Sequence, residues 1–392
     1  MKNSHLFVFW LLIAALAFAT PASAAYENDS EARYLISQDI LGYLRNADQE
    51  EPTINELYQA ASLYPEYPRS INDSAGNTFV FYQPVKKVVI LNNNAADALT
   101  VIGTDDLIVG VAESLKENSL QFPETSTLPS VGKWMEPDIE AILALDPDLV
   151  IAYGSWPDPE KLETHLPNDI PVIRMDFYKT ETYRSEMEAV GHLFNKEENA
   201  DEYLEWYDHY FDLVNERIQD IPEEERVRVY AEAGEGQSFG RRAYSTGTGL
   251  HDLLVAAGGV NIAEEYIDGY ADVETEWIIY QKPESVLIWS GKGGYKTDER
   301  DLVISQYNGF TGITGSDKIP AVSEGRVYVI TSSFAFGSSS PAALVQVGSW
   351  LYPSRFEDID AQSVHEQYLE KYTQTAEDVW DEGTFYYPDG KD

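Results

Sequence analysis

The feature that most constrains this chain is an alternation of short apolar runs with stretches of helical periodicity, which occurs twice along the sequence. The first series has expected strands at 87–91, 107–112, 148–152 and 171–176 and expected helices at 95–102 and 137–145. Short strands that are apolar throughout are typical of a mostly parallel sheet whose two faces are both covered by helices. The first series therefore predicts an α/β lobe.

A second series of the same kind follows, with expected strands at 227–231, 285–289 and 326–330 and expected helices at 250–257, 276–281 and 364–372. Between the two series, residues 196–219 contain no Gly or Pro and place aromatic residues at a spacing of three to four, which predicts one long amphipathic helix. The expected fold is thus α/β, with two Rossmann-like lobes joined by one long interdomain helix. Because ligands of open α/β sheets bind beyond the carboxyl ends of the strands, we expect a ligand cleft between the lobes.

The N-terminus has the composition of a secretory signal. Lys2 precedes an apolar run at 6–19, and the small residues Ala22, Ser23 and Ala24 follow, so cleavage is expected after Ala24 or Ala25. The apolar run is too short to cross a bilayer, which needs about 20 residues. The chain contains no cysteine, which excludes an N-terminal lipidated cysteine and disulfides. We therefore expect an exported protein, in the periplasm or at the outer face of the cytoplasmic membrane, without a lipid anchor.

The composition also predicts how the chain divides. The expected parts are a signal peptide at 1–25, an N-terminal helical appendage at 26–68, lobe one at 69–195, the interdomain helix at 196–221, lobe two with a C-terminal helix at 222–375, and a tail at 376–392. The appendage contains two amphipathic stretches, at 34–44 and 54–64, and the turn residues 73–77 separate two β-prone runs, which indicates a hairpin. Asn28 and Asn72 each begin an Asn-x-Ser triplet, which permits glycosylation without showing it.

The chain is strongly acidic. It has 67 acidic and 27 basic residues, a net charge of −40, and a field of that sign repels nucleic acid and anionic lipid. The acidic residues are dispersed along the sequence, which favours a solubilising surface coat. Attraction of cations is the alternative interpretation.

Three segments carry recognisable motifs: Pro137 to Ile151, PDIEAILALDPDLVI, which is the most specific, Gly247 to Leu253, and Ala257 to Asn261. They resemble elements of the class III periplasmic binding proteins for ferric siderophores, haem and vitamin B12. The resemblance covers about residues 69–372. It implies a non-enzymatic monomer without a cofactor that delivers a small-molecule metal chelate or corrinoid to the permease and ATPase of an ABC importer. It also implies that Glu140 and Glu276, one on each lobe, dock on the permease.

The loops that follow the expected strands supply the candidate ligand-binding residues. They are Asn93, Lys133, Trp134, Trp156, Tyr178, Phe239, Arg241, Arg242, Tyr244, Trp289, Tyr295 and Phe336. So many aromatic side chains suit a flat or bulky ligand, and the two arginines suit carboxylate or catecholate oxygens. We therefore expect a siderophore-like ferric chelate, with a corrinoid such as cobalamin, or haem, as the alternative.

Other functions fit the sequence less well. The histidines after the signal segment fall outside the cleft loops, so no metal-ligating residues are expected. Residues 236–240 match the G-x-S-x-G nucleophile elbow, which makes a serine hydrolase using Ser238 a distant alternative. That elbow requires a helix directly after the serine, whereas the residues that follow are polar and rich in glycine. A structural or adhesive surface protein is the third hypothesis.

Overall fold

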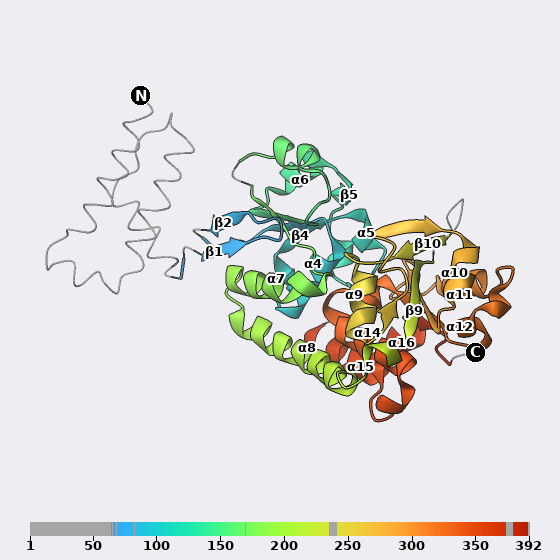
Figure 1. Ribbon diagram of the computed structural model, residues 1–392. Coiled ribbons are helices and arrows are strands. Elements are labelled where there is room, and N and C mark those ends of the chain that lie inside the picture. Colours follow the sequence, from blue (N-terminus) through green and yellow to red (C-terminus); the bar gives the residue numbers. More distant parts are fainter. Residues whose placement is uncertain are drawn as a thin grey trace, which may run out of the picture. The chain divides into compact units, whose positions relative to one another are not determined.

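The computed structural model describes residues 64, 66–67, 69–81, 83–168, 170–234, 241–373 and 379–390 (Figure 1). The expected signal peptide and the helix at 34–44 lie outside these residues, as does the helix at 54–64 apart from Tyr64. The chain divides into two compact units, described here separately: one extends to Ile71 and includes Thr78–Val85, and the other comprises Asn72–Asn77 and the chain from Lys86 onward.

In the first unit, two short strands form a sheet. Strand β1 (Arg69–Asn72) pairs with β2 (Thr78–Phe81), on either side of the expected turn. The hairpin prediction is therefore confirmed. The turn residues 73–77 belong to the second unit.

The second unit contains two separate sheets, around which we define two lobes. The sheet of lobe one has the order β4-β3-β7-β8 and is parallel throughout. Its strands are β3 (Val88–Ile90), β4 (Ile108–Val111), β7 (Leu149–Ala152) and β8 (Val172–Arg174). Nearly all of their residues are buried, as expected for strands covered on both faces. A short hairpin of β5 (Gly132–Lys133) and β6 (Glu136–Pro137) forms a sheet of its own.

The described part of lobe one contains four α-helices, two of which begin at a side-chain cap. The four helices are α4 (Asn93–Val101), α5 (Glu113–Lys116), α6 (Ile139–Leu145) and α7 (Thr180–Leu193). The side chain of Asn92 accepts from the Ala95 amide at the start of α4, and Asp138 accepts from Ala141 at the start of α6. Helix α7 was missing from the sequence prediction, because its apolar residues are diluted by Glu, Thr and Arg.

A single long helix, α8 (Glu197–Ile218), leads from lobe one to lobe two, as expected (Figure 1). Its buried face includes Tyr203, Tyr207 and Tyr210, and it packs against α7 and α14. None of the helices in the described residues has an apolar stretch that could span a bilayer.

The sheet of lobe two has seven strands in the order β12-β10-β9-β13-β14-β15, with β11 paired to β9. The strands are β9 (Arg228–Ala233), β10 (Arg241–Tyr244), β11 (Val260–Asn261), β12 (Tyr270–Val273), β13 (Ser285–Ser290), β14 (Val327–Thr331) and β15 (Tyr386–Tyr387). The central strands β9, β13 and β14 are parallel, whereas β10, β12 and β15 run antiparallel to their neighbours. Strand β15 lies in the segment expected as a tail at 376–392 and pairs with β14; it is too short to have a recognisable period.

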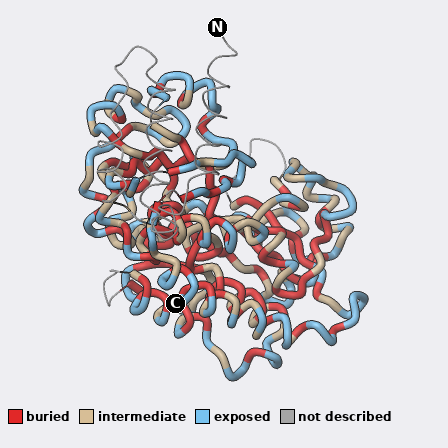
Figure 2. Tube along the Cα trace, turned by 90° about the vertical axis from the view of Figure 1, so that its left-hand side faces the viewer, coloured by how far each residue is buried: buried red, intermediate tan, exposed pale blue. Residues whose placement is uncertain are grey.

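Helices cover this second sheet. They are α9 (Gly249–Ala256), α10 (Thr275–Gln281), α11 (Arg300–Thr311), α12 (Pro320–Ser323), α13 (Ser332–Ala335), α14 (Ser340–Leu351), α15 (Ala361–Tyr372) and α16 (Val379–Glu382). Helix α14 escaped prediction because it is apolar on most of its surface and lacks a polar face. Figure 2 shows buried residues in the interior of the second unit and exposed residues at its periphery.

His365 lies in the core of lobe two without a charged partner. Its Nε2 atom is 2.9 Å from the Tyr295 hydroxyl, and its ring contacts those of Phe334, Trp380 and Phe385. Burial lowers the pKa of His365 to about 3, because desolvation disfavours the imidazolium. The folded protein therefore holds this ring neutral.

This depressed pKa predicts an acid-sensitive core. The unfolded chain protonates His365 near pH 6.5 and the folded chain only near pH 3, so the free energy of unfolding should fall as the pH falls through this window. The loss is at most about 1.4 kcal/mol per pH unit. In the His365→Gln variant, the free energy of unfolding should depend less steeply on pH across this window. Urea denaturation at a series of pH values measures this dependence. The exposed His165→Gln serves as the control, and equal slopes in all three proteins would contradict the assignment.

Candidate functional site

A cavity of about 570 Å³ lies between the two lobes, within the second unit. Its lining comes from the segments that follow the carboxyl ends of β3, β4, β7 and β8 in lobe one, and from the ends of β10, β13 and β14 in lobe two. This is the position expected for a ligand site in open α/β sheets. The volume falls within the range of about 300–1,000 Å³ that is usual for small-molecule sites.

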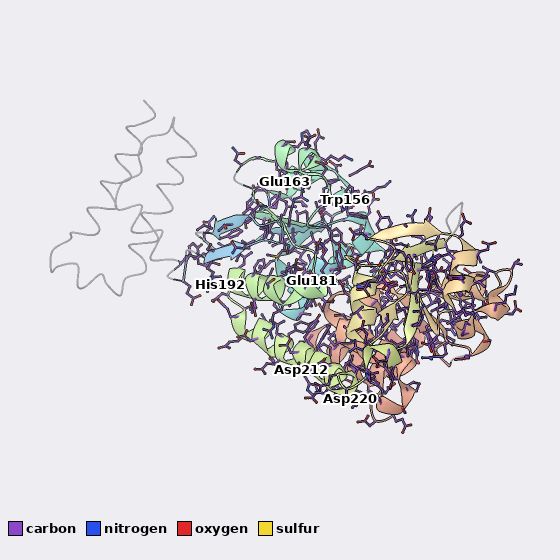
Figure 3. The ribbon with its side chains drawn as sticks, viewed as in Figure 1. Trp156, Glu163, Glu181, His192, Asp212 and Asp220 are labelled. Atoms are coloured by element: carbon purple, nitrogen blue, oxygen red, sulfur yellow. The ribbon has the colours of Figure 1, made fainter. Side chains whose placement is uncertain are left out.

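The structure brings together seven of the candidate ligand-binding residues. The cavity lining includes Asn93, Trp134, Trp156, Tyr178, Tyr244, Trp289 and Phe336. Trp156 is 51% exposed on the loop after β7 (Figure 3). Phe239 lies outside the described residues, as does the G-x-S-x-G segment with Ser238.

The other four candidates do not line the cavity. Lys133 is exposed on β5, and Tyr295 is buried against His365. The Arg241 guanidinium forms a two-point ion pair with the buried Glu232.

Arg242 is likewise occupied elsewhere. Its Nε atom donates to Asp272 at 3.0 Å, and its guanidinium lies over the Tyr270 ring. The sequence-based expectation that the two arginines face the ligand therefore lacks geometric support. Glu232 and Asp272, the partners of the two arginines, lie on β9 and β12, the strands that pair with β10. The apolar pattern of the sequence does not predict these pairings.

Aromatic rings line the lobe-one side of the cavity in a continuous row. Trp134 contacts Tyr153 at a ring-centroid distance of 5.5 Å, and Tyr153 contacts Tyr178 at 6.1 Å. Tyr178 in turn lies 6.4 Å from Phe336, which belongs to lobe two. We call Trp134, Tyr153 and Tyr178 the lobe-one row. Tyr153 was missed from the sequence, where it follows β7 directly and looks like a continuation of the strand.

A second row lines the lobe-two side. Tyr244 lies 6.0 Å from Trp289 and 5.7 Å from Tyr270 between ring centroids. We call these three residues the lobe-two row. The Trp289 indole N–H is buried and has no hydrogen-bond partner among the described residues.

Amide and hydroxyl groups also line the lobe-one side of the cavity. They belong to Asn93, Asn94, Ser114, Asn118 and Gln121. The Ser114 hydroxyl donates to Asn93 Oδ1 at 2.9 Å. Helices α4 and α9 begin at the cavity wall, and the positive ends of their dipoles favour acceptor oxygens.

Each charged side chain that lines the cavity already has a partner. Lys179 Nζ lies 2.6 Å from Asp176 Oδ2, and Lys296 Nζ lies 2.8 Å from Glu117 Oε2. The Asp97 carboxylate accepts several hydrogen bonds. The cavity therefore presents little net charge to a ligand.

The tyrosines of the lobe-one row are held in the phenol form. Burial raises the pKa of both Tyr153 and Tyr178, and the neighbouring Asp176 raises them further. A tyrosinate oxygen is therefore costly to form here, and these side chains are suited to stacking and hydrogen bonding.

Asp97 connects the two lobes at the cavity wall. Its Oδ1 atom accepts from the Tyr368 hydroxyl at 2.6 Å and from Gln121 Nε2 at 3.4 Å, while its Oδ2 accepts from the Ser338 amide at 3.1 Å. Burial raises the pKa of Asp97, and the hydrogen bonds from Tyr368 and Ser338 oppose that rise.

Removing this carboxylate should destabilise the protein. Substitution Asp97→Ala leaves the buried Tyr368 hydroxyl and Ser338 amide without an acceptor, and we expect the free energy of unfolding to fall by about 2–4 kcal/mol. Asp97→Asn retains one acceptor and should lose less. Denaturant titrations measure both, with the exposed Asp106→Ala as control. A loss for Asp97→Ala no larger than for Asp106→Ala would show that the connection contributes nothing.

Comparison with known proteins matches the "Periplasmic binding protein" family model to residues 88–334. The chain is 23% identical over 338 residues to the molybdate-binding protein MolA of Haemophilus influenzae, covering 79% of this chain and 92% of that protein. It is 26% identical over 208 residues to the petrobactin-binding protein YclQ of Bacillus subtilis, covering 52% and 63%. It is 24% identical over 243 residues to a cobalamin-binding protein of Halobacterium salinarum, covering 61% and 62%.

Among solved structures, the chain is similar to the TroA-like periplasmic binding protein FepB from Veillonella parvula. The TM-score is 0.65 at 21% sequence identity, and the match covers 81% of this chain and 99% of that one. The likeness supports the two-lobed fold.

Proposed function

This chain belongs to the periplasmic binding protein family, and from that premise we propose that it is the extracytoplasmic solute receptor of an ABC importer. We further propose that its cargo is a bulky metal complex of low net charge, in the first instance a corrinoid. The observation that carries the proposal is the pair of aromatic rows that line one cavity from two lobes. The permease and ATPase of the importer are then its partners, and its role is binding without catalysis.

The shape of the lining supports a ligand with extended faces. The lobe-one row and the lobe-two row supply six aromatic side chains, and Trp156 and Phe336 add two more. Such rings gain most from a flat or bulky ligand that removes them from water. A small tetrahedral anion such as molybdate, the ligand named for the Haemophilus relative, would leave most of this surface unused.

The charge of the lining distinguishes between bulky complexes. A ferric catecholate is strongly anionic, and it would need free cations, whereas Lys179 and Lys296 are both ion-paired. A corrinoid carries peripheral amides, which can exchange hydrogen bonds with the Asn and Gln side chains of lobe one. This argument reverses the preference for a siderophore-like chelate, because that preference rested on Arg241 and Arg242.

The proposal predicts the order of ligand affinities. In calorimetric titrations we expect saturable binding of cobalamin, and weaker or no binding of a ferric catecholate chelate and of molybdate. Trp289→Phe replaces an indole of the lobe-two row with a smaller ring, which reduces the aromatic surface offered to the ligand, and should weaken cobalamin binding by about tenfold. Trp350→Phe is the matched control, because Trp350 stacks on Tyr328 outside the cavity lining.

The competing outcomes are separable. If a neutral ferric hydroxamate binds more tightly than cobalamin, the argument for a ligand of low charge stands, but the corrinoid is the wrong ligand. Tighter binding of the catecholate chelate or of molybdate would overturn the charge argument itself.

The two glutamates proposed to dock on the permease occupy equivalent places in the two lobes. Helices α6 and α10 each have seven residues, with Glu140 and Glu276 exposed in their first turns. Both helices end at a non-glycine residue in the left-handed conformation, Asp146 with φ 50° and Lys282 with φ 52°.

The equivalence continues beyond the helices. Each is followed by a proline and an acidic residue, Asp148 or Glu284, whose carboxylate accepts from the backbone of the neighbouring strand segment, at Lys87 or Arg228. The strands β7 and β13 come next in the chain. Lobe one and lobe two thus present the same motif, and two copies of one carboxylate can report whether the lobe spacing is correct.

We predict that Glu140→Ala combined with Glu276→Ala leaves the cobalamin Kd unchanged and abolishes uptake. Charge complementarity with permease arginines is the physical reason. Uptake of radiolabelled cobalamin by cells that carry the cognate importer measures the effect. The matched control is Glu198→Ala with Glu370→Ala, which removes two exposed helical carboxylates elsewhere. Normal transport by the Glu140 and Glu276 double variant would disprove the docking role.

A further inference from the structure

The cavity residue Tyr178 directly follows a residue with a left-handed backbone conformation. Tyr178, the last member of the lobe-one row, follows Phe177, which is fully buried and has φ 52°. A bulky residue in the left-handed region is strained and persists only where its surroundings hold it. The segment from Met175 to Lys179 therefore requires an external support.

The support comes from a buried carboxylate that does not touch the cavity. Glu186 on α7 is 2% exposed, and its Oε2 atom accepts from the Phe177 amide at 2.6 Å. Its Oε1 atom accepts from the Asp176 amide at 3.0 Å and from the Thr182 hydroxyl at 3.3 Å. The amides of Asp176 and Phe177 thus both donate to the Glu186 carboxylate. These two hydrogen bonds fix the backbone directly before Tyr178 and so the direction of the Tyr178 side chain.

The same carboxylate is also bound by a residue 112 positions earlier in the chain. The Ser74 hydroxyl donates to Glu186 Oε1, and the Ser74 amide donates to the Arg174 carbonyl at 2.9 Å. The preceding Asp73 accepts from the Arg174 amide at 3.2 Å. The turn at 73–77 is therefore attached to the end of β8, directly before the loop that carries Tyr178.

Hydrogen bonds within the turn at 73–77 also hold its shape. Asp73 accepts from the amides of Ala75 and Asn77 and from the Asn77 side chain, so its carboxylate closes the turn on itself. Asp73 is 6% exposed, although it lies in a turn of otherwise exposed residues. The turn is thus a fixed element of lobe one, and it precedes residue 88, where the family match begins.

We propose that Glu186 and the turn at 73–77 are positioning elements of the binding site, which hold the Asp176–Phe177 backbone so that Tyr178 faces the ligand. The inference rests on the proposed function only in taking the cavity as the ligand site. It assigns a role to a segment outside the family match: the turn at 73–77 supports the loop that carries Tyr178.

The first test needs no ligand. Ser74→Ala removes one hydroxyl from an exposed turn, and Glu186→Gln keeps one acceptor oxygen while replacing the other with an amide. In both variants, hydrogen exchange of the Asp176 and Phe177 amides should accelerate at least tenfold in the ligand-free protein. Ser185→Ala is the control, because its hydroxyl donates only to the Thr182 carbonyl at the surface of the same helix. Unchanged exchange in both variants would overturn the proposal.

The second test separates positioning from general stability. Glu186→Gln should weaken cobalamin binding by about tenfold in the wild-type background, and it should add nothing to Tyr178→Ala, because the two substitutions remove the same contact. Additive losses would show that Glu186 acts through the fold at large and not through Tyr178. If wild-type protein fails to bind cobalamin, the proposed ligand is wrong, and the exchange measurement still decides whether the turn supports the loop.

Discussion

The arrangement of the site depends on one buried carboxylate at the boundary of the lobes. Asp97 lies in α4 of lobe one, yet the Tyr368 hydroxyl and the Ser338 amide, which donate hydrogen bonds to its carboxylate, belong to lobe two. A buried carboxylate is stable only where donors surround it, so separating the lobes at this point would leave an uncompensated charge. The hydroxyl groups of Tyr183 and Tyr203 also donate to Ser338, to its hydroxyl and its carbonyl oxygen respectively. The lobes are thus fastened at this wall of the cavity, which explains why both belong to one compact unit.

A second connection between the lobes has a different character. Lys296 of lobe two and Glu117 of lobe one form an ion pair in which the glutamate side chain is 66% exposed. Exposed ion pairs contribute little, about 0–1 kcal/mol, whereas the Asp97 network is buried and cannot exchange its donors for water. Relative motion of the lobes should therefore break the Lys296 pair before it disturbs Asp97. Exchange of a bulky ligand would then require only a limited opening, pivoting where the buried hydrogen bonds hold.

The sequence predicted the parallel core well and the site less completely, for a physical reason. Strands β3, β7 and β13 are apolar on both faces and have nearly uniform surroundings, so the local pattern was sufficient to identify them. Arg241 pairs with Glu232 because the antiparallel register of β10 and β9 places Ala243 opposite Glu232. No local sequence pattern encodes this register. The support of Tyr178 by Ser74 and Glu186 joins residues more than a hundred positions apart. Such contacts follow from the tertiary fold, and they occupy Arg241, Arg242 and Tyr295, three of the four candidates that do not line the cavity.

The strong acidity of the chain and the chemistry of its cavity point to the same class of ligand. A net charge of −40 generates a repulsive field for anions, and a receptor for a polyanion would need a compensating cluster of cations at the mouth of its site. The lining instead pairs Lys179 with Asp176 and Lys296 with Glu117, so neither cation is left to attract a distant anion. Salt screens the long-range field within about 10 Å, but it does not create the missing contacts inside a cavity. Binding energy must then come from removing rings from water and from directed hydrogen bonds, and both are available to a large ligand of low charge whose faces fit between two rows of aromatic side chains.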